Sequence, residues 1–134
     1  MMQKLSRFLF GDQSGAAMVE FMLVSTVVFL PLVFGVIEFG RGIWVKTTVT
    51  AAAREGARWA IVHGSQADTI ADSAKVASYV IARTQLTGIV VKPSWTGLEH
   101  GDTASVTVTY TFVPIIRLFP DKTIASTSKQ IIAY

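Results

Sequence analysis

The sequence predicts an α+β protein with a long N-terminal helix, a second helix and a small antiparallel sheet. Three patterns support this class: an apolar segment of helical length over residues 16–39, a stripe of small residues at spacings of three and four, and apolar residues alternating with hydroxyls over residues 103–112. With 134 residues, 51% of them hydrophobic, the chain has room for one membrane segment and one small domain. We expect a leader at 1–15, a transmembrane and assembly helix at 16–40, and an α+β head at 41–134.

Composition argues against several function classes. The net charge of +3 comes from 12 basic and 9 acidic residues without clustering, which does not indicate nucleic-acid binding. There is no cysteine, so a disulfide or a thiolate metal site cannot form. The two histidines, His63 and His100, have no metal-ligand spacing, and each adjoins a glycine in an expected turn. Neither a phosphate loop nor a nucleophile elbow is present, so we expect no enzyme, no catalytic residue, no metal and no cofactor.

The helical pattern extends from Ala17 to about Val62. Pro31 removes one backbone donor, and we expect a kink near Thr26–Pro31 rather than an end, because lipid or neighbouring helices can hold the rest of the helix. Beyond the membrane segment the helix becomes amphipathic. Its small-residue stripe, which lets another backbone approach closely, consists of Val45, Val49, Ala52, Ala53, Gly56 and Ala60. On its other faces we expect solvated charges or short-range pairs: Lys46, Arg54, Glu55 and Arg58.

A second helix follows in the head. Ser65 and Asp68 form a candidate capping box. The helix is expected to end around Thr84–Gly88 and to bury one face, made of Ile70, Ala74, Ala77 and Ile81.

Two to four antiparallel strands complete the predicted head. Ile89–Lys92 predicts a short strand that Pro93 stops. Thr103–Phe112 predicts the clearest strand, after a turn at Glu99–Asp102, and Thr123–Ala133 predicts the last. The buried face of the clearest strand is expected to hold Ala104, Val106, Val108, Tyr110 and Phe112.

An apolar segment bracketed by prolines, Val113–Pro120, connects the last two strands. If it is an exposed loop, it is a candidate subunit contact through Ile115, Ile116, Leu118 and Phe119. Alternatively it folds back onto the core, which a domain of this size favours because it needs every apolar residue.

Glu20 lies at the start of an apolar run that contains no charge before Glu38. A carboxylate costs about 2.5–3.5 kcal/mol at the centre of a spanning helix and less near its end, so Glu20 needs a partner. Alternatively, an acid in an early turn only complements the helix dipole. A cleaved signal peptide is disfavoured because its candidate site, Ala51–Ala53, lies too far downstream. An uncleaved single-span anchor remains open, since about 20 apolar residues cross the hydrocarbon core.

The segment Gly15-Ala16-Ala17-Met18-Val19-Glu20-Phe21, between a basic leader and an apolar helix, resembles the processing site of type IV prepilins and pseudopilins. In that class a membrane aspartic peptidase cuts after the glycine, which implies a mature N-terminus at Ala16. Glycine presents no side chain to a narrow protease cleft. The new α-amino group is largely cationic at neutral pH and can pair with Glu20 of a neighbouring subunit. The resemblance assigns Glu20 and Phe21 to assembly.

Two further motifs, Glu38-Phe39-Gly40-Arg41 and Ala51-Ala52-Ala53-Arg54-Glu55-Gly56-Ala57-Arg58, resemble the TadE-like family of tight-adherence pilus systems. The resemblance is specific over Gly15–Arg58. It implies a minor pilin or pseudopilin required for pilus assembly, because the major pilins of these systems end soon after the helix. Implied partners are the prepilin peptidase, other pilin and minor pilin subunits, the inner-membrane assembly platform and the lipid bilayer.

The resemblance implies a single-pass protein of the inner membrane with its head outside the cytoplasm. It also allows incorporation into the pilus. The alternative is an uncleaved single-span accessory protein that recruits pilus or secretion assembly factors.

Overall fold

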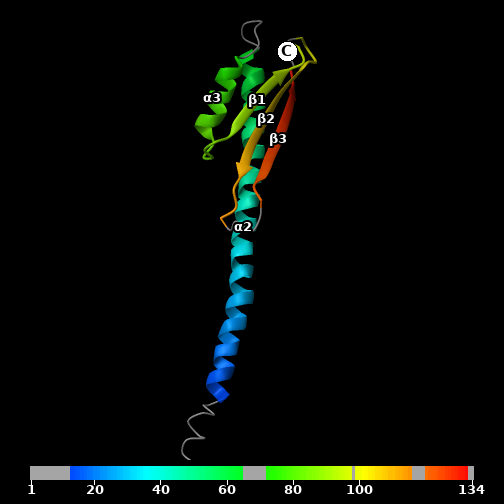
Figure 1. Ribbon diagram of the computed structural model, residues 1–134. Coiled ribbons are helices and arrows are strands. Elements are labelled where there is room, and N and C mark those ends of the chain that lie inside the picture. The colour runs from blue at the N-terminus through cyan, green and yellow to red at the C-terminus, as the bar shows by residue number, and fades with distance from the viewer. Residues whose placement is uncertain (1–12, 65–71, 98, 116–119, 133–134) are drawn as a thin grey trace, which may run out of the picture. The chain divides into compact units, whose positions relative to one another are not determined.

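The computed structural model describes residues 13–64, 72–97, 99–115 and 120–132. Its elements are helices α2 (Gln13–Gly64) and α3 (Ser73–Arg83), followed by strands β1 (Val90–Trp95), β2 (Thr103–Phe112) and β3 (Lys122–Ile131) (Figure 1). The predicted α+β class is therefore confirmed. The chain divides into two compact units, Met1–Phe39 and Gly40–Tyr134, which we call the span unit and the head unit.

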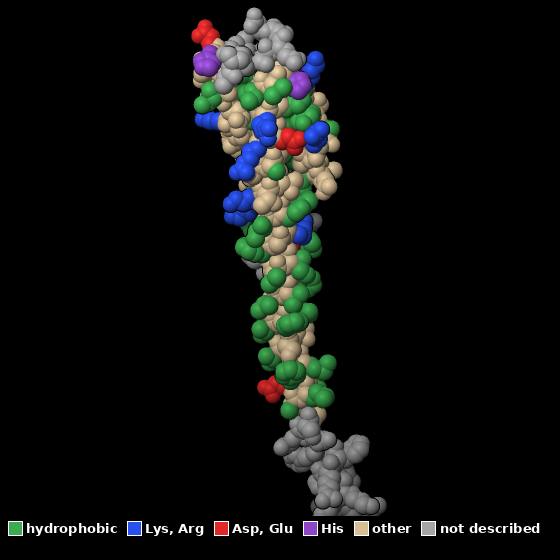
Figure 2. All heavy atoms as spheres, turned by 180° about the vertical axis from the view of Figure 1, so that it is seen from behind, with side chains coloured by type: hydrophobic (Ala, Val, Ile, Leu, Met, Phe, Trp, Pro, Cys, Tyr) green, Lys and Arg blue, Asp and Glu red, His purple; other side chains and the backbone are tan. Residues whose placement is uncertain are grey.

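Helix α2 continues through Pro31 and is slightly longer at both ends than the pattern predicts. Proline is tolerated because it removes only one backbone donor from a long ladder of hydrogen bonds. The kink near Thr26–Pro31 remains a prediction. The part of α2 that belongs to the span unit carries closely spaced hydrophobic side chains, whereas lysines and arginines gather over the head unit (Figure 2).

The small-residue stripe of α2 forms one side of the head core. All six predicted positions are buried, and Ala57, which the pattern missed, is fully buried with them. Gly56 lies where three elements meet: a Cβ added there would be 2.7 Å from Val80 Cγ2 of α3 and 3.2 Å from Val106 Cγ1 of β2. The head thus requires glycine at position 56 because two other elements pack directly against the helix backbone.

The sheet has the order β1-β2-β3, with both pairs antiparallel. The central strand β2 has the predicted bounds, and Ala104, Val106, Val108 and Phe112 are buried while Tyr110 is partly buried. On the other face the hydroxyl oxygens of Thr107 and Thr127 lie 2.8 Å apart. The alternation in this strand therefore reports one covered face and one wet face, as predicted.

The first strand corrects one prediction. Pro93 does not stop it: β1 runs from Val90 to Trp95, and Pro93 is in register with Val106. The sheet tolerates this proline because β1 is an edge strand, where a missing backbone donor need not interrupt a ladder. The turn at Glu99–Asp102 is confirmed by a 3.0 Å hydrogen bond from Asp102 N to Glu99 O, with Gly101 at a φ of 96°. The last strand ends slightly earlier than predicted, at Ile131.

The second helix begins later than expected and buries a different face. Asp72 is its N-cap, and its side chain accepts a 3.0 Å hydrogen bond from Ala74 N. Its buried residues are Val76 and Val80, while Ile81 is 50% exposed. Among the described residues the predicted buried face is therefore wrong. The helix instead turns Val76 and Val80 toward Gly56 and the sheet. Ser65, Asp68 and Ile70 lie outside the described residues.

Candidate functional site

The predicted processing segment lies along the first turns of α2. Because the helix begins at Gln13, the bond between Gly15 and Ala16 is in its first turn, where backbone donors have no intrahelical acceptors. Glu20 is exposed, and the side chain of Phe21 is 71% exposed. A Cβ added to Gly15 would meet no atom within 4 Å. Packing within the described chain therefore gives no reason for a glycine at this position.

The apolar helix that follows has the properties of a membrane span. Its most apolar window of 18 residues has a mean hydropathy of 2.2, and none of that window is buried by the chain itself. Large apolar side chains point outward all around it, including Met22, Val27, Leu32 and Ile37. A helix that is apolar on every face needs an apolar environment outside its own chain, which a bilayer or a bundle of like helices provides.

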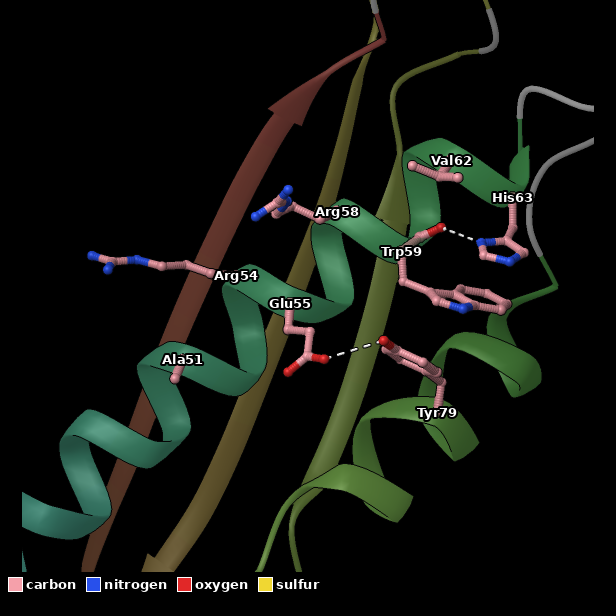
Figure 3. Close-up of a pocket in the computed structure, with 8 residues that line it drawn as sticks. All are labelled: Ala51, Arg54, Glu55, Arg58, Trp59, Val62, His63 and Tyr79. Atoms are coloured by element: carbon pink, nitrogen blue, oxygen red, sulfur yellow. Dashed lines mark hydrogen bonds between the residues drawn. The ribbon is translucent and has the colours of Figure 1, made fainter.

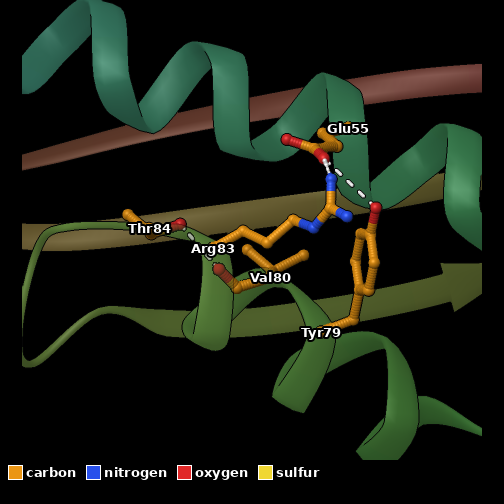
Figure 4. A network of polar contacts seen from close by, with 5 residues as sticks. All are labelled: Glu55, Tyr79, Val80, Arg83 and Thr84. Atoms are coloured by element: carbon orange, nitrogen blue, oxygen red, sulfur yellow. Dashed lines mark hydrogen bonds and ion pairs between the residues drawn. The ribbon is translucent and has the colours of Figure 1, made fainter.

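In the head unit a polar junction joins α2 to α3 through Glu55. Its Oε1 atom accepts hydrogen bonds from Arg83 Nη1 at 2.8 Å and from the Tyr79 hydroxyl at 3.1 Å (Figure 4). The Arg83 guanidinium also lies 4.9 Å from the centre of the Tyr79 ring. Glu55 stays at the surface, as expected, but its ion pair is long-range rather than the expected short-range one. Arg54 and Arg58 are exposed as expected.

An aromatic stack lies beside this junction and lines an open groove (Figure 3). The Trp59 ring is stacked between His63, at 4.0 Å between centroids, and Tyr79, at 5.2 Å. His63 Nδ1 lies 3.1 Å from Trp59 O, in the last turn of α2 rather than in the expected turn. His100 does lie in a turn. Among the described residues, no group of three histidines or acids could hold a metal ion.

The sequence pattern does not predict this stack, although the spacing of its residues along each helix is visible in the sequence. Trp59 and His63, like Tyr79 and Arg83, are four residues apart on their helices and so lie on one face. The contact of Trp59 with Tyr79 depends on how α2 packs against α3, which local spacing does not encode.

The loop after β2 begins at the end of the head unit that carries Arg41. The Arg41 guanidinium lies 5.1 Å from the centre of the Phe112 ring. Beyond Phe112, Pro114 is buried, whereas Val113 is 53% and Ile115 66% exposed. The other predicted contact residues, Ile116, Leu118 and Phe119, lie outside the described residues. The role of this loop as a subunit contact remains a prediction.

The model of the TadE-like protein family matches residues 15–58. This confirms the resemblance, with the range that the motifs indicated. The TadE-like segment starts at the predicted cleavage glycine and ends in the part of α2 that forms the head core. Comparisons with curated proteins and with solved structures give no significant match. The match therefore supports a pilin-like protein associated with a tight-adherence pilus, with a helix that can span a membrane.

Proposed function

We propose that this chain is a minor pilin or pseudopilin of a tight-adherence pilus. It is made as a membrane-anchored precursor, cut after Gly15 by a prepilin peptidase, and assembled with other pilin subunits on an inner-membrane platform. The observation that carries the proposal is the TadE-like match over residues 15–58, which contains the cleavage glycine, Glu20 and the exposed apolar helix in one segment.

The position of Gly15 supports processing. Its neighbours in the described chain leave open space for a side chain, unlike those of Gly56, so the fold does not require this glycine. A peptidase that accepts an extended backbone in a narrow cleft does require it. The first turn of a helix is also the part that opens at the least cost, because its donors lack intrahelical partners.

The position of Glu20 supports assembly. In a bundle of like helices a lone carboxylate is costly, whereas a carboxylate paired with the α-amino group of a cleaved neighbour is tolerated. Cleavage after Gly15 places that amine at Ala16, one helical turn before Glu20 of the same chain. A neighbour displaced by about one turn along the fibre axis then brings its amine to this carboxylate.

The presence of the head unit supports the assignment of this chain as a minor subunit rather than as the major subunit of the pilus. Most of it, including the whole sheet, follows the TadE-like segment, and it has a core of its own. A helical bundle needs no such domain for its own packing. We assign the head to contacts that set where the subunit sits among other pilins.

The experiment that tests the assembly role compares Glu20→Ala with Glu20→Asp in cells that contain the complete pilus system. We expect the alanine variant to be cut and inserted normally but to be depleted from sheared pili or from cross-linked complexes with other pilins. The aspartate variant keeps the charge and should retain part of the assembly. Glu38→Gln, which removes the carboxylate at the other end of the apolar run, is the matched control.

Two results contradict this proposal. Normal assembly of Glu20→Ala would show that the amine does not need this carboxylate. Equal loss of assembly in Glu38→Gln would show that the effect comes from removing any helix charge rather than from a specific pair.

A further inference from the structure

We propose that the head unit rests on the lipid surface through one end, which inserts apolar side chains at the boundary between headgroups and acyl chains. The inserted residues are Ile43 and Trp44 of α2 together with Val113 and Ile115 of the loop after β2. We call this set the lipid-facing end. The proposal rests on the proposed function in one respect, because it requires that the apolar helix spans a membrane.

The chain itself places this end at the membrane surface. The apolar run ends at Phe39, and Arg41 follows two residues later in the sequence, so the chain holds the two residues within about 7 Å of each other. The Arg41 guanidinium lies 5.1 Å from the Phe112 ring centre, so the end of β2 is at the same level as the helix exit. Val113 and Ile115 follow directly and must lie near that level.

Exposed apolar side chains concentrate at this end. The described part of the head unit has eight exposed large hydrophobic residues, and four of them belong to the lipid-facing end. Ile43 and Trp44 are each 49% exposed, and Ile115 is the most exposed of all eight at 66%. Tryptophan is enriched at the interface between membrane and water, where its ring is apolar and its N–H is hydrated. Water alone offers these side chains no favourable surroundings, whereas the lipid boundary does.

The charges at this end suit phospholipid headgroups. Lys122 is in register with Phe112 and is exposed, Arg41 lies over that ring, and Lys46 is exposed two residues beyond Trp44. Two acids are close in sequence: Asp121 adjoins Lys122, and Glu38 is three residues before Arg41. Long basic side chains can lay their stems along apolar surface while their charged ends reach phosphates. The combination of exposed apolar residues with mostly basic neighbours favours a lipid surface over the apolar helix of another subunit.

The absence of cysteine makes a direct depth measurement possible. Single variants Val113→Cys and Ile115→Cys of the full chain are spin-labelled and reconstituted, one copy per nanodisc of phosphatidylethanolamine and phosphatidylglycerol. Collision of the label with oxygen and with a water-soluble nickel chelate then reports its depth. We expect both labels to favour oxygen, at a depth of about 5–10 Å within the interface.

Two control positions separate the possible failures. Ile131→Cys is matched in exposure, at 61%, but pairs with Thr103 at the opposite end of the sheet, so its label should collide with the nickel chelate as in water. Val27→Cys, 63% exposed in the span unit, should lie deeper in lipid than Ile115→Cys. An aqueous label at Ile115 with a deep label at Val27 would overturn this inference alone. An aqueous label at Val27 would overturn the membrane span as well.

Nanodiscs with one copy and with two or more copies of the chain test whether another subunit, rather than lipid, covers this end. If the labels at Val113 and Ile115 leave water only in nanodiscs that contain two or more copies, another subunit covers this end and the lipid contact is wrong. If they are in lipid with a single copy, the lipid contact holds.

Discussion

The carboxylate of Glu55 accepts a hydrogen bond from Arg83 at 2.8 Å and so ties α2 to α3 across 28 residues of sequence. Both side chains are substantially exposed, at 46% for Glu55 and 62% for Arg83. Solvent therefore screens the pair, and its contribution to stability is small. Its position matters more, because the same Glu55 oxygen also accepts a hydrogen bond from Tyr79, whose ring is part of the aromatic stack.

We expect a double-mutant cycle of Glu55→Ala and Arg83→Ala to give a coupling energy of about 0.2–1 kcal/mol at low salt. Raising the salt concentration should reduce it. Thermal unfolding of the reconstituted full chain can be followed by tryptophan fluorescence, since all three tryptophans lie in the head unit. Arg54→Ala with Glu55→Ala is the matched control and should show no coupling. A coupling of several kcal/mol, insensitive to salt, would contradict this account of a screened pair.

The close approach at Gly56 leads to a stronger effect. Gly56→Ala improves helix propensity by about 0.5–1 kcal/mol but places a methyl group 2.7 Å from Val80 Cγ2, and overpacking of that kind costs about 1–3 kcal/mol. We expect a net loss of about 1–2 kcal/mol in the free energy of unfolding. Gly42→Ala is the matched control in the same helix, because a Cβ there meets nothing within 4 Å and should raise stability slightly.

A second substitution shows whether the clash is the cause. Val80→Ala removes the methyl group nearest the new Cβ, so Gly56→Ala should cost less in that background than in the native one. If Gly56→Ala stabilises the native head as much as Gly42→Ala does, the packing of α2 against α3 and β2 is wrong.

The elements predicted correctly from the sequence are those in which apolar or small residues mark a single buried face. Strand β2 alternates without exception over ten residues, and its bounds were predicted correctly. The small-residue stripe of α2 was predicted because one face of the helix alone lacks bulk and charge. In both cases the local period and the tertiary burial agree.

Helix α3 was predicted less well, because it carries apolar residues on more than one face. Ala74, Ala77 and Ile81 have helical spacing, and so do Val76 and Val80. The choice between these faces is made by contact with Gly56 and the sheet, which is not local information. The predicted end of strand β1 was too early. Proline would stop a central strand, but the order of the sheet places β1 at its edge, where Pro93 is tolerated.

For the candidate site, the processing motif at Gly15–Phe21 is more informative about function than the contacts described within the chain. Within the described residues a Cβ added to Gly15 meets nothing and Glu20 is exposed, so the interpretation of both rests on the family pattern. The stack of Trp59 with Tyr79 was missed for the opposite reason, because it depends entirely on the packing of two helices.

The mass of the N-terminal peptide tests the central claim most directly. Protein purified from cells with and without the prepilin peptidase is digested, and its first residue is identified by mass spectrometry. Cleavage after Gly15 predicts Ala16 as the first residue when the peptidase is present and an uncut leader when it is absent. An intact leader in both samples would contradict the account and would favour the uncleaved membrane accessory.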